Sequence, residues 1–166
     1  MSDALAMAAL AGAVRGVGRA LRADRCWLYA RDPADGAGIA LVRWLRAGDV
    51  ADVPLGLRDW TIEAPDLSET DPLFARALAG VPADAIGDTR AARVNRGLED
   101  ALGHRAFVHL NLHQDGRLVG VLQPGMTGAP RAWTETEALI ALRPALAALT
   151  AAAIRGTRPA SIRLLD

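Results

Sequence analysis

The chain has 166 residues, 51% of them hydrophobic, which is enough for one domain with a single sizeable core. Its 19 basic residues, all arginine, balance 19 acidic ones, and without surplus positive charge we do not expect nucleic acid as a primary partner. The lone Cys26 excludes an internal disulfide and a thiolate-rich metal site and favours a reducing cytoplasm. Asp3 and Arg15 in the apolar N-terminal stretch argue against a signal peptide or a membrane span.

The first predicted element is a helix near the N-terminus. Its apolar residues recur at alternating steps of three and four, the spacing of a single helix face; they are Met7, Leu10, Val14, Val17 and Leu21. A hairpin follows, with strands over 25–30 and 39–45 that are rich in aromatic and β-branched residues. Residues 46–68 show no sustained period, which predicts an irregular loop with one short helix.

The middle of the chain is predicted to hold two helices and a short strand. Asp71 and Pro72 are typical of a helix N-cap and first residue, and Gly80 is typical of the helix end. A strand over 83–88 comes next, and then a helix over 91–102.

A second hairpin and a last helix complete the predicted elements. The hairpin spans 107–124 around Asp115 and Gly116, a pair typical of a two-residue turn. The last helix is predicted to begin at a T-x-x-E capping box of Thr134 and Glu137. Its apolar stripe has the spacing of the first helix and consists of Leu139, Leu142, Leu146, Leu149 and Ala153.

This order of elements predicts an α+β fold, an antiparallel sheet with helices segregated on its faces. We expect one domain over 1–155 and a C-terminal tail or linker over 156–166. The two apolar stripes, at opposite ends of the chain, suggest that the terminal helices pack together and also form a homodimer. The alternative is that both stripes only cover the sheet within one monomer.

Five segments stand in one order between residues 8 and 155: ADRCWLYARD, LVRW, AIGD ahead of a helix and strand ending ALGHRAFVHLNL, DGRLVGVL, and RAWTETEALIALRPALA. In this order they resemble a GAF domain, the sensory module of phytochromes, phosphodiesterases and many bacterial signalling proteins. The resemblance implies that the first and last helices pack on one sheet face and commonly form a dimer interface. It implies a ligand pocket on the other face, roofed by the middle loop and helices.

The strand over 105–113 carries two polar residues in an otherwise apolar alternation, His109 and Asn111. They share a strand face with Phe107, whereas the opposite face is purely apolar and should meet the terminal helices. Val121 and Gln123 on the partner strand should face the same way. In phytochrome-like relatives the residues matching His109 and Asn111 are polar and contact the chromophore's carboxylates. The alternative is that His109, Asn111 and Gln123 satisfy one another or loop backbone without a ligand.

Four further residues are candidates for the pocket. Only one of Arg43 and Trp44 can face it, because neighbours on a strand point to opposite sides. Trp60 is either an aromatic lid over a ligand or a loop anchor packed on the core. Asp88 either bonds a ligand or caps the following helix.

This sequence lacks residues on which the known chemistries of the family depend. Cys26 is not at the usual bilin attachment sites, the family's methionine sulfoxide reductases depend on several cysteines, and the lysine of the cyclic-nucleotide signature is missing. Haem ligated by His104, His109 or His113 is a minor alternative. We therefore expect a cytoplasmic sensor of a small molecule in bacterial signal transduction, with no enzymatic activity, metal or resident cofactor. The second hypothesis is a dimerisation module whose pocket is filled by its own side chains.

Overall fold

The computed structural model of the chain describes residues 3–158, so most of the predicted tail lies outside the described residues. The helices are α1 (Asp3–Ala20), α2 (Leu67–Thr70), α3 (Pro72–Leu78), α4 (Arg96–Leu102) and α5 (Thr136–Thr157), with a 3-10 turn, η1, at Leu55–Leu57. The strands are β1 (Arg25–Arg31), β2 (Ala37–Leu45), β3 (Thr61–Ile62), β4 (Ala83–Ile86), β5 (Ala106–Gln114) and β6 (Arg117–Met126).

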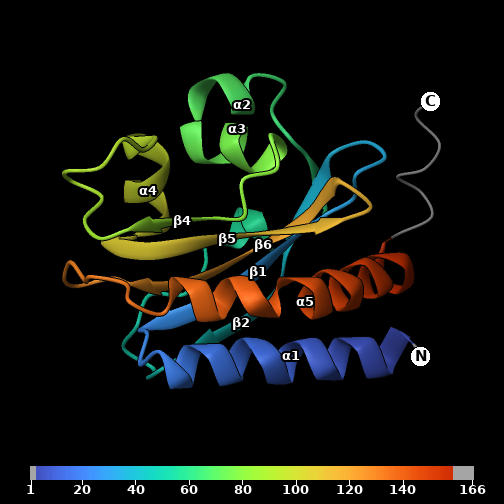
Figure 1. Cartoon of the computed structure of the whole chain (residues 1–166), viewed down its shortest axis with the longest axis horizontal. Coiled ribbons are helices and arrows are strands. Elements are labelled where there is room, and N and C mark those ends of the chain that lie inside the picture. The colour runs from blue at the N-terminus through green and yellow to red at the C-terminus, as the bar shows by residue number, and fades with distance from the viewer. Residues whose placement is uncertain (1–2, 159–166) are drawn as a thin grey trace.

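The strands form one antiparallel sheet in the order β3-β2-β1-β6-β5-β4. α1 and α5 lie side by side on one face, and α2, α3 and α4 lie on the other (Figure 1). The predicted α+β architecture is therefore confirmed, and the irregular segment between β2 and α3 contains η1, β3 and the short α2.

Most of the predicted local structure is confirmed by backbone geometry. Asp71 caps α3 by accepting the Leu73 N–H. Asp115 and Gly116 join β5 to β6 with φ of +51° and +75°, the left-handed values that a tight primed turn requires. α4 ends at Gly103 as predicted, but it begins at Arg96, five residues late, because Asn95 provides the side-chain cap to Leu98 N.

The predicted capping box of α5 is wrong. The helix begins at Thr136, and its N-cap residue, Glu135, makes no side-chain cap. The Glu135 carboxylate instead accepts the Thr134 N–H at 3.0 Å and the Arg131 guanidinium at 2.7 Å. These local bonds hold Thr134 outside the helix, so Thr134 cannot act as the cap.

The main core lies between the sheet and the terminal helices. The apolar face of β5 contributes Val108, Leu110 and Leu112, and it packs with the predicted stripes of α1 and α5. Leu142 is the exception in the α5 stripe, because it is 44% exposed. The terminal helices thus cover the sheet within one monomer and leave an outer α5 surface free for other contacts.

A close contact between α1 and β2 leads to a first prediction. The Trp44 ring lies so close to Gly18 that an alanine Cβ there would be 2.2 Å from Trp44 Cε3, whereas Gly16 has open space around it. Gly18→Ala should lower the free energy of unfolding by about 1–3 kcal/mol through overpacking. Gly16→Ala, the control, should raise it by up to about 1 kcal/mol, because alanine is the better helix former. Urea denaturation measures both, and equal stability of the two variants would contradict the prediction.

Candidate ligand-binding site

A cavity of about 270 Å³ lies between the sheet and the α2–α4 layer. Its floor comes from β1, β5 and β6, and its roof comes from the segment 57–74 and from α4. The lining residues are Trp27, Tyr29, Leu57, Thr61, Ile62, Glu63, Ala64, Leu67, Asp71, Phe74, Leu98, Glu99, Leu102, His109, Val121 and Gln123. Most of the wall is apolar and a few polar groups converge on it, as is typical of small-molecule sites.

The pairing register of β1, β5 and β6 places the residues of the cavity floor on one face of the sheet. Trp27 pairs with Gln123 and Tyr29 pairs with Val121 across β1 and β6, and Asn111 of β5 pairs with Val121. Residues paired across a sheet point to the same face, so these side chains form one surface. The prediction that Val121 and Gln123 face the same side as His109 and Asn111 is confirmed.

The imidazole of His109 is oriented by Asn111. Asn111 Nδ2 donates to the Val81 carbonyl at 2.9 Å, so its Oδ1 must be the acceptor from His109 Nδ1 at 2.7 Å. The proton of a neutral His109 is therefore on Nδ1, and Nε2 is an acceptor. Burial lowers the pKa of His109, so the neutral form is favoured. One backbone carbonyl thus decides the tautomer of a cavity-lining histidine.

Gln123 differs from this pair. Its side chain is only 6% exposed, lines the cavity, and makes no hydrogen bond to any residue from 3 to 158. Its amide atoms keep some exposure to the cavity, unlike the fully enclosed Nε1 of Trp27, and a complete burial without partners would cost about 1–3 kcal/mol. The proposed self-satisfied trio therefore exists only as the His109–Asn111 pair, and Gln123 is left for another partner.

Two buried acids complete the polar part of the wall. Glu99 Oε2 lies 2.7 Å from Nδ1 of His104, and burial raises the pKa of Glu99 to about 7. His104 is itself buried, its pKa is held well below the usual value, and its ring stacks on Phe107 at 4.6 Å between centroids. Burial also raises the pKa of Asp71, the N-cap of α3.

Several predicted pocket residues lie elsewhere. Trp44 is on the opposite face, packed on Gly18 of α1, because it pairs with Cys26 rather than with Trp27. Arg43 pairs with Trp27 but binds Asp52 at 2.9 Å outside the cavity. The two residues therefore face opposite sides of the sheet as expected, with Arg43 on the cavity side, but neither lines the cavity.

Trp60, Asp88 and Phe107 also do not line the cavity. Trp60 packs against the main core, as the anchor alternative foresaw. Asp88 accepts the Arg90 N–H and forms an ion pair with Arg105, so it stabilises a local turn rather than a ligand or α4. Phe107 is fully buried beside His104, with its ring also edge-on to His109, and so supports the wall from behind.

Sequence reasoning missed Asp71 and Glu99 as cavity residues. The sequence predicted Asp71 only as a helix N-cap, and Glu99 was not among the candidate residues. A weak signal for Glu99 was its place one residue after Leu98, since both residues lie on the turn of α4 that faces the sheet.

No cofactor or metal site is evident at the cavity. Among residues 3–158, no group of three His, Cys, Asp or Glu side chains is placed to hold a metal ion. Of the three histidines considered for haem, His104 bonds Glu99, and His113 is held at the sheet edge by Ala77 and Arg143. Only His109 lines the cavity, whose volume falls below the ~300–1,000 Å³ of typical ligand sites.

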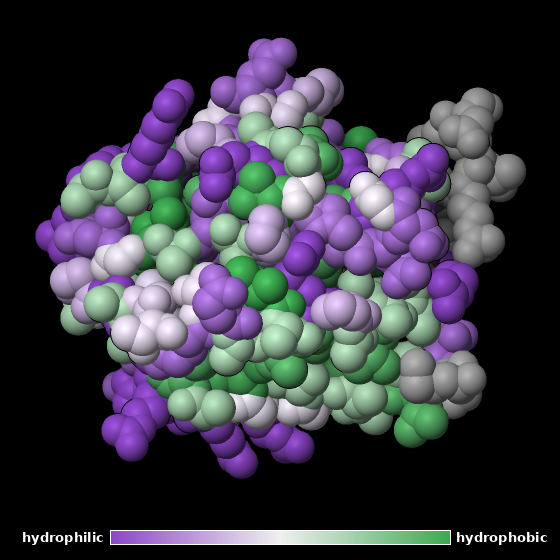
Figure 2. Space-filling model, in the orientation of Figure 1, coloured by the Kyte–Doolittle hydropathy of each residue, from purple (hydrophilic) through white to green (hydrophobic). Residues whose placement is uncertain are grey.

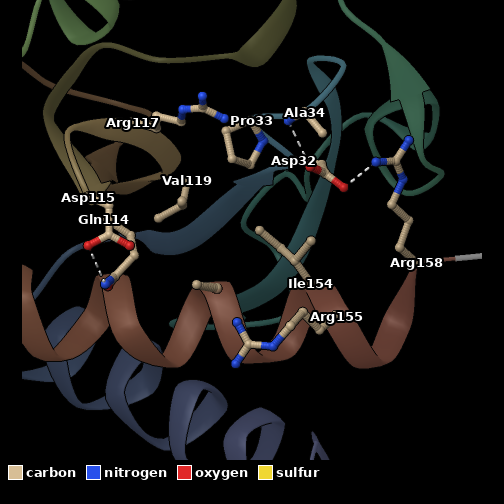
Figure 3. A pocket seen from close by; sticks show the side chains of 11 residues that line it. Asp32, Pro33, Ala34, Gln114, Asp115, Arg117, Val119, Ile154, Arg155 and Arg158 are labelled. Carbon is tan, nitrogen blue, oxygen red and sulfur yellow. Dashed lines mark hydrogen bonds and ion pairs between the residues drawn. The ribbon is translucent and has the colours of Figure 1, made fainter. Parts of the chain in front are cut away.

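A larger hollow of about 690 Å³ lies at the far end of the sheet, between the two hairpin turns and the end of α5 (Figure 3). There Arg158 forms ion pairs with Asp32 and Asp35, which tie the end of α5 to the β1–β2 turn. Arg117 and Arg155 on its rim are exposed. This hollow is a charged groove, whereas the cavity over β1, β5 and β6 has a mostly apolar wall and is the better candidate for a ligand.

An antiparallel sheet with a terminal helix pair on one face and a roofed cavity on the other defines a sensory type of α+β domain. The chain belongs to the GAF domain family, whose model matches residues 7–154. No curated protein matches the sequence.

Solved structures agree with this assignment at the level of the fold. The blue-light-absorbing form of the PixJ GAF domain from Thermosynechococcus elongatus is 22% identical, with a TM-score of 0.68 over 100% of this chain and 98% of that chain. A phycocyanobilin-bound GAF domain from a cyanobacterial phytochrome is 15% identical, with a TM-score of 0.68 over 93% and 88%. The free methionine-R-sulfoxide reductase from Neisseria meningitidis, in complex with its substrate, is 19% identical, with a TM-score of 0.61 over 92% and 81%.

Proposed function

We propose that this GAF domain senses a small molecule in bacterial signal transduction, and that the ligand binds in the cavity over β1, β5 and β6. The observation that carries the proposal is Gln123, a buried amide that lines the cavity and lacks a partner among the described residues. Structural neighbours that hold phycocyanobilin or a substrate support binding of a small ligand by this fold.

A chain of hydrogen bonds connects the cavity with the terminal helices. Arg143 of α5 donates to the Asn111 carbonyl at 2.6 Å and to Nδ1 of His113 at 2.9 Å. His113 Nε2 donates in turn to the Ala77 carbonyl of α3 at 2.8 Å. A ligand that shifts His109, Asn111 or the roof would thereby bias the position of α5. The signal would be a population shift between two arrangements of α5 on the sheet.

The alternative of a ligand-free dimerisation module is less well supported. It requires a pocket filled by its own side chains, whereas the cavity here is open and Gln123 is unsatisfied. A degenerate pocket would be expected to have replaced such an amide by an apolar residue, since that change is favourable for stability.

We also propose that the domain is not an enzyme and does not attach a bilin covalently. The only thiol of the chain, on Cys26, is fully buried in the core that α1 and α5 cover, and burial raises its pKa. A thiolate nucleophile at the cavity is therefore unsupported. Location in the cytoplasm remains part of the proposal. By length and composition α5 could cross a membrane, but helices in the cores of soluble proteins pass the same test.

We expect a homodimer formed through the outer face of α5. Apolar side chains gather over α5 and its border with α1 in Figure 2. The exposed residues of α5 from 138 to 148 are all uncharged: Ala138, Ala141, Leu142, Pro144, Ala145 and Ala148. A second copy is the occupant that fits, because small residues on both partners allow close helix packing.

Leu142→Glu should weaken dimerisation by at least about tenfold, because it buries an unpaired charge in the expected interface. Leu78→Glu, on α3 at the opposite face of the sheet, is the matched control and should leave the dimer intact. Light scattering coupled to size-exclusion chromatography distinguishes the two. A wild-type chain that is monomeric throughout the micromolar range would contradict the expectation.

Native mass spectrometry of freshly purified protein, compared with the denatured mass of the same sample, tests the proposed function. Extra mass released on denaturation would support the sensor and identify its ligand. A bare chain that also shows no thermal shift with any of the three probes described below would contradict the proposal.

A further inference from the structure

The charged groups on the cavity wall are all carboxylates. They belong to Glu63, Asp71 and Glu99, and no arginine lines the cavity. Glu63 is neutralised by an ion pair with Arg31 at 2.7 Å. Asp71 and Glu99 form no ion pair with an arginine anywhere in residues 3–158. The wall therefore carries two carboxyl groups that no arginine pairs directly, and burial raises the pKa of both, so a cation beside them would favour their charged forms.

A buried arginine offsets part of this charge without lining the cavity. Arg25 is 1% exposed and donates to the carbonyls of Leu102 and Ala51. Its positive charge opposes the rise in the pKa of Glu99. Its terminal nitrogens face backbone oxygens and it does not line the cavity, so Arg25 does not present its charge to a ligand there.

The uncharged polar groups of the wall include both acceptors and donors. The Val81 carbonyl and Asn111 place the His109 proton on Nδ1, so Nε2 of a neutral His109 can only accept. Gln123 offers both an acceptor and a donor, and Trp27 contributes one buried N–H that has no partner in the described chain. The preference for a ligand that supplies donors therefore comes from the carboxyl groups of Asp71 and Glu99 together with His109 Nε2.

The rest of the wall is aromatic and aliphatic. Trp27 and Tyr29 come from β1 and Phe74 comes from α3, and leucines from η1, α2 and α4 also line the cavity. Ring faces attract a nearby cation and also accommodate an apolar ligand body. The small volume limits that body to a compact group.

We infer that the cavity binds a compact organic cation, a protonated amine on an aromatic or aliphatic body, in preference to a carboxylate. The inference rests on the proposed function and specifies its ligand class. The ammonium group would lie near Asp71 and Glu99 and donate to His109 Nε2 or Gln123 Oε1. The apolar body would lie against Trp27.

Three probes with the same phenylethyl body test the inference: 2-phenylethylamine, 2-phenylethanol and 3-phenylpropionate. Isothermal titration calorimetry on the full chain should show 2-phenylethylamine binding at least about tenfold more tightly than 3-phenylpropionate. Equal or tighter binding of 3-phenylpropionate would overturn the inference and leave the sensor proposal standing. No binding of any probe would overturn the inference, and with a bare native mass it would reject the sensor proposal too.

Replacing Asp71 by asparagine tests how much its negative charge contributes to ligand binding. Asparagine also caps helices, so the bond to Leu73 N can be kept and only the negative charge is removed. The affinity for 2-phenylethylamine should fall by about tenfold, while that for 2-phenylethanol should stay within about twofold. Glu69→Gln, an exposed change on α2, is the control and should alter neither affinity. An equal loss for both probes would show a purely structural role for Asp71 and would overturn the assignment.

Discussion

Replacing Gln123 by leucine should abolish ligand binding and raise the stability of the ligand-free domain by about 1 kcal/mol. Gln123 is 6% exposed and has no hydrogen-bond partner among residues 3–158, so the folded state bears a partial desolvation of its amide that no protein group compensates. Leucine has a similar volume and no polar atoms, and it suits the apolar neighbours Trp27 and Val121. A residue kept for binding at the expense of stability is expected at a functional site.

The chain offers a matched control for this experiment. Gln114→Leu makes the same change at the end of β5, outside the cavity, and should leave binding unchanged. Urea denaturation of ligand-free protein reports stability, and the native mass or 2-phenylethylamine titration reports binding. A Gln123→Leu variant that is destabilised, or that binds as well as wild type, would remove Gln123 from the site.

Replacing Glu99 by glutamine should flatten the dependence of stability on pH. Burial raises the pKa of Glu99 in the folded state from 4.5 to about 7, so between these values the folded state binds more protons than the unfolded state. The free energy of unfolding therefore decreases as pH rises from about 4.5 to 7, by a contribution of about 3 kcal/mol from this residue. Below pH 4.5 this contribution is fully present.

Glutamine cannot titrate, so the free energy of unfolding of Glu99→Gln should not show the decrease that Glu99 causes as pH rises. Urea denaturation at pH 5.0 and 7.5 measures the difference, and Glu69→Gln at the exposed surface of α2 should behave as wild type. Arg25, Asp100 and His104, the charged and titratable neighbours of Glu99, are present in both proteins, so comparing the two slopes reports on the Glu99 carboxyl group. An unchanged slope in Glu99→Gln would show that Glu99 keeps an ordinary pKa.

The α+β fold could be predicted because its elements follow from local periodicity. The three-four spacing of Leu10, Val14 and Val17 predicted α1, and the period of two in β5 separated Val108 and Leu110 from His109. The Asp115–Gly116 turn set the register of the hairpin. These features depend on residues close together in sequence.

Predictions failed where a residue had competing local partners. Thr134 has the sequence of a capping residue, but Glu135 takes its N–H and the Arg131 guanidinium. Alternation along the strand could not decide whether Trp44 or Arg43 faces the cavity. Only the pairing of β1 with β2, and the space that Gly18 leaves for an indole ring, placed Trp44 beneath α1.

The sequence by itself determined the sheet, its two faces and the position of His109, Asn111, Val121 and Gln123 on the cavity side, because alternation along a strand is a local property. Only the tertiary structure decided that His109 and Asn111 form a hydrogen bond with each other and that Gln123 has no such bond. It also decided that Asp71 and Glu99 line the same cavity. The physical reason is that hydrogen bonding, burial and charge in the cavity depend on segments from residue 27 to residue 123 that meet only on folding.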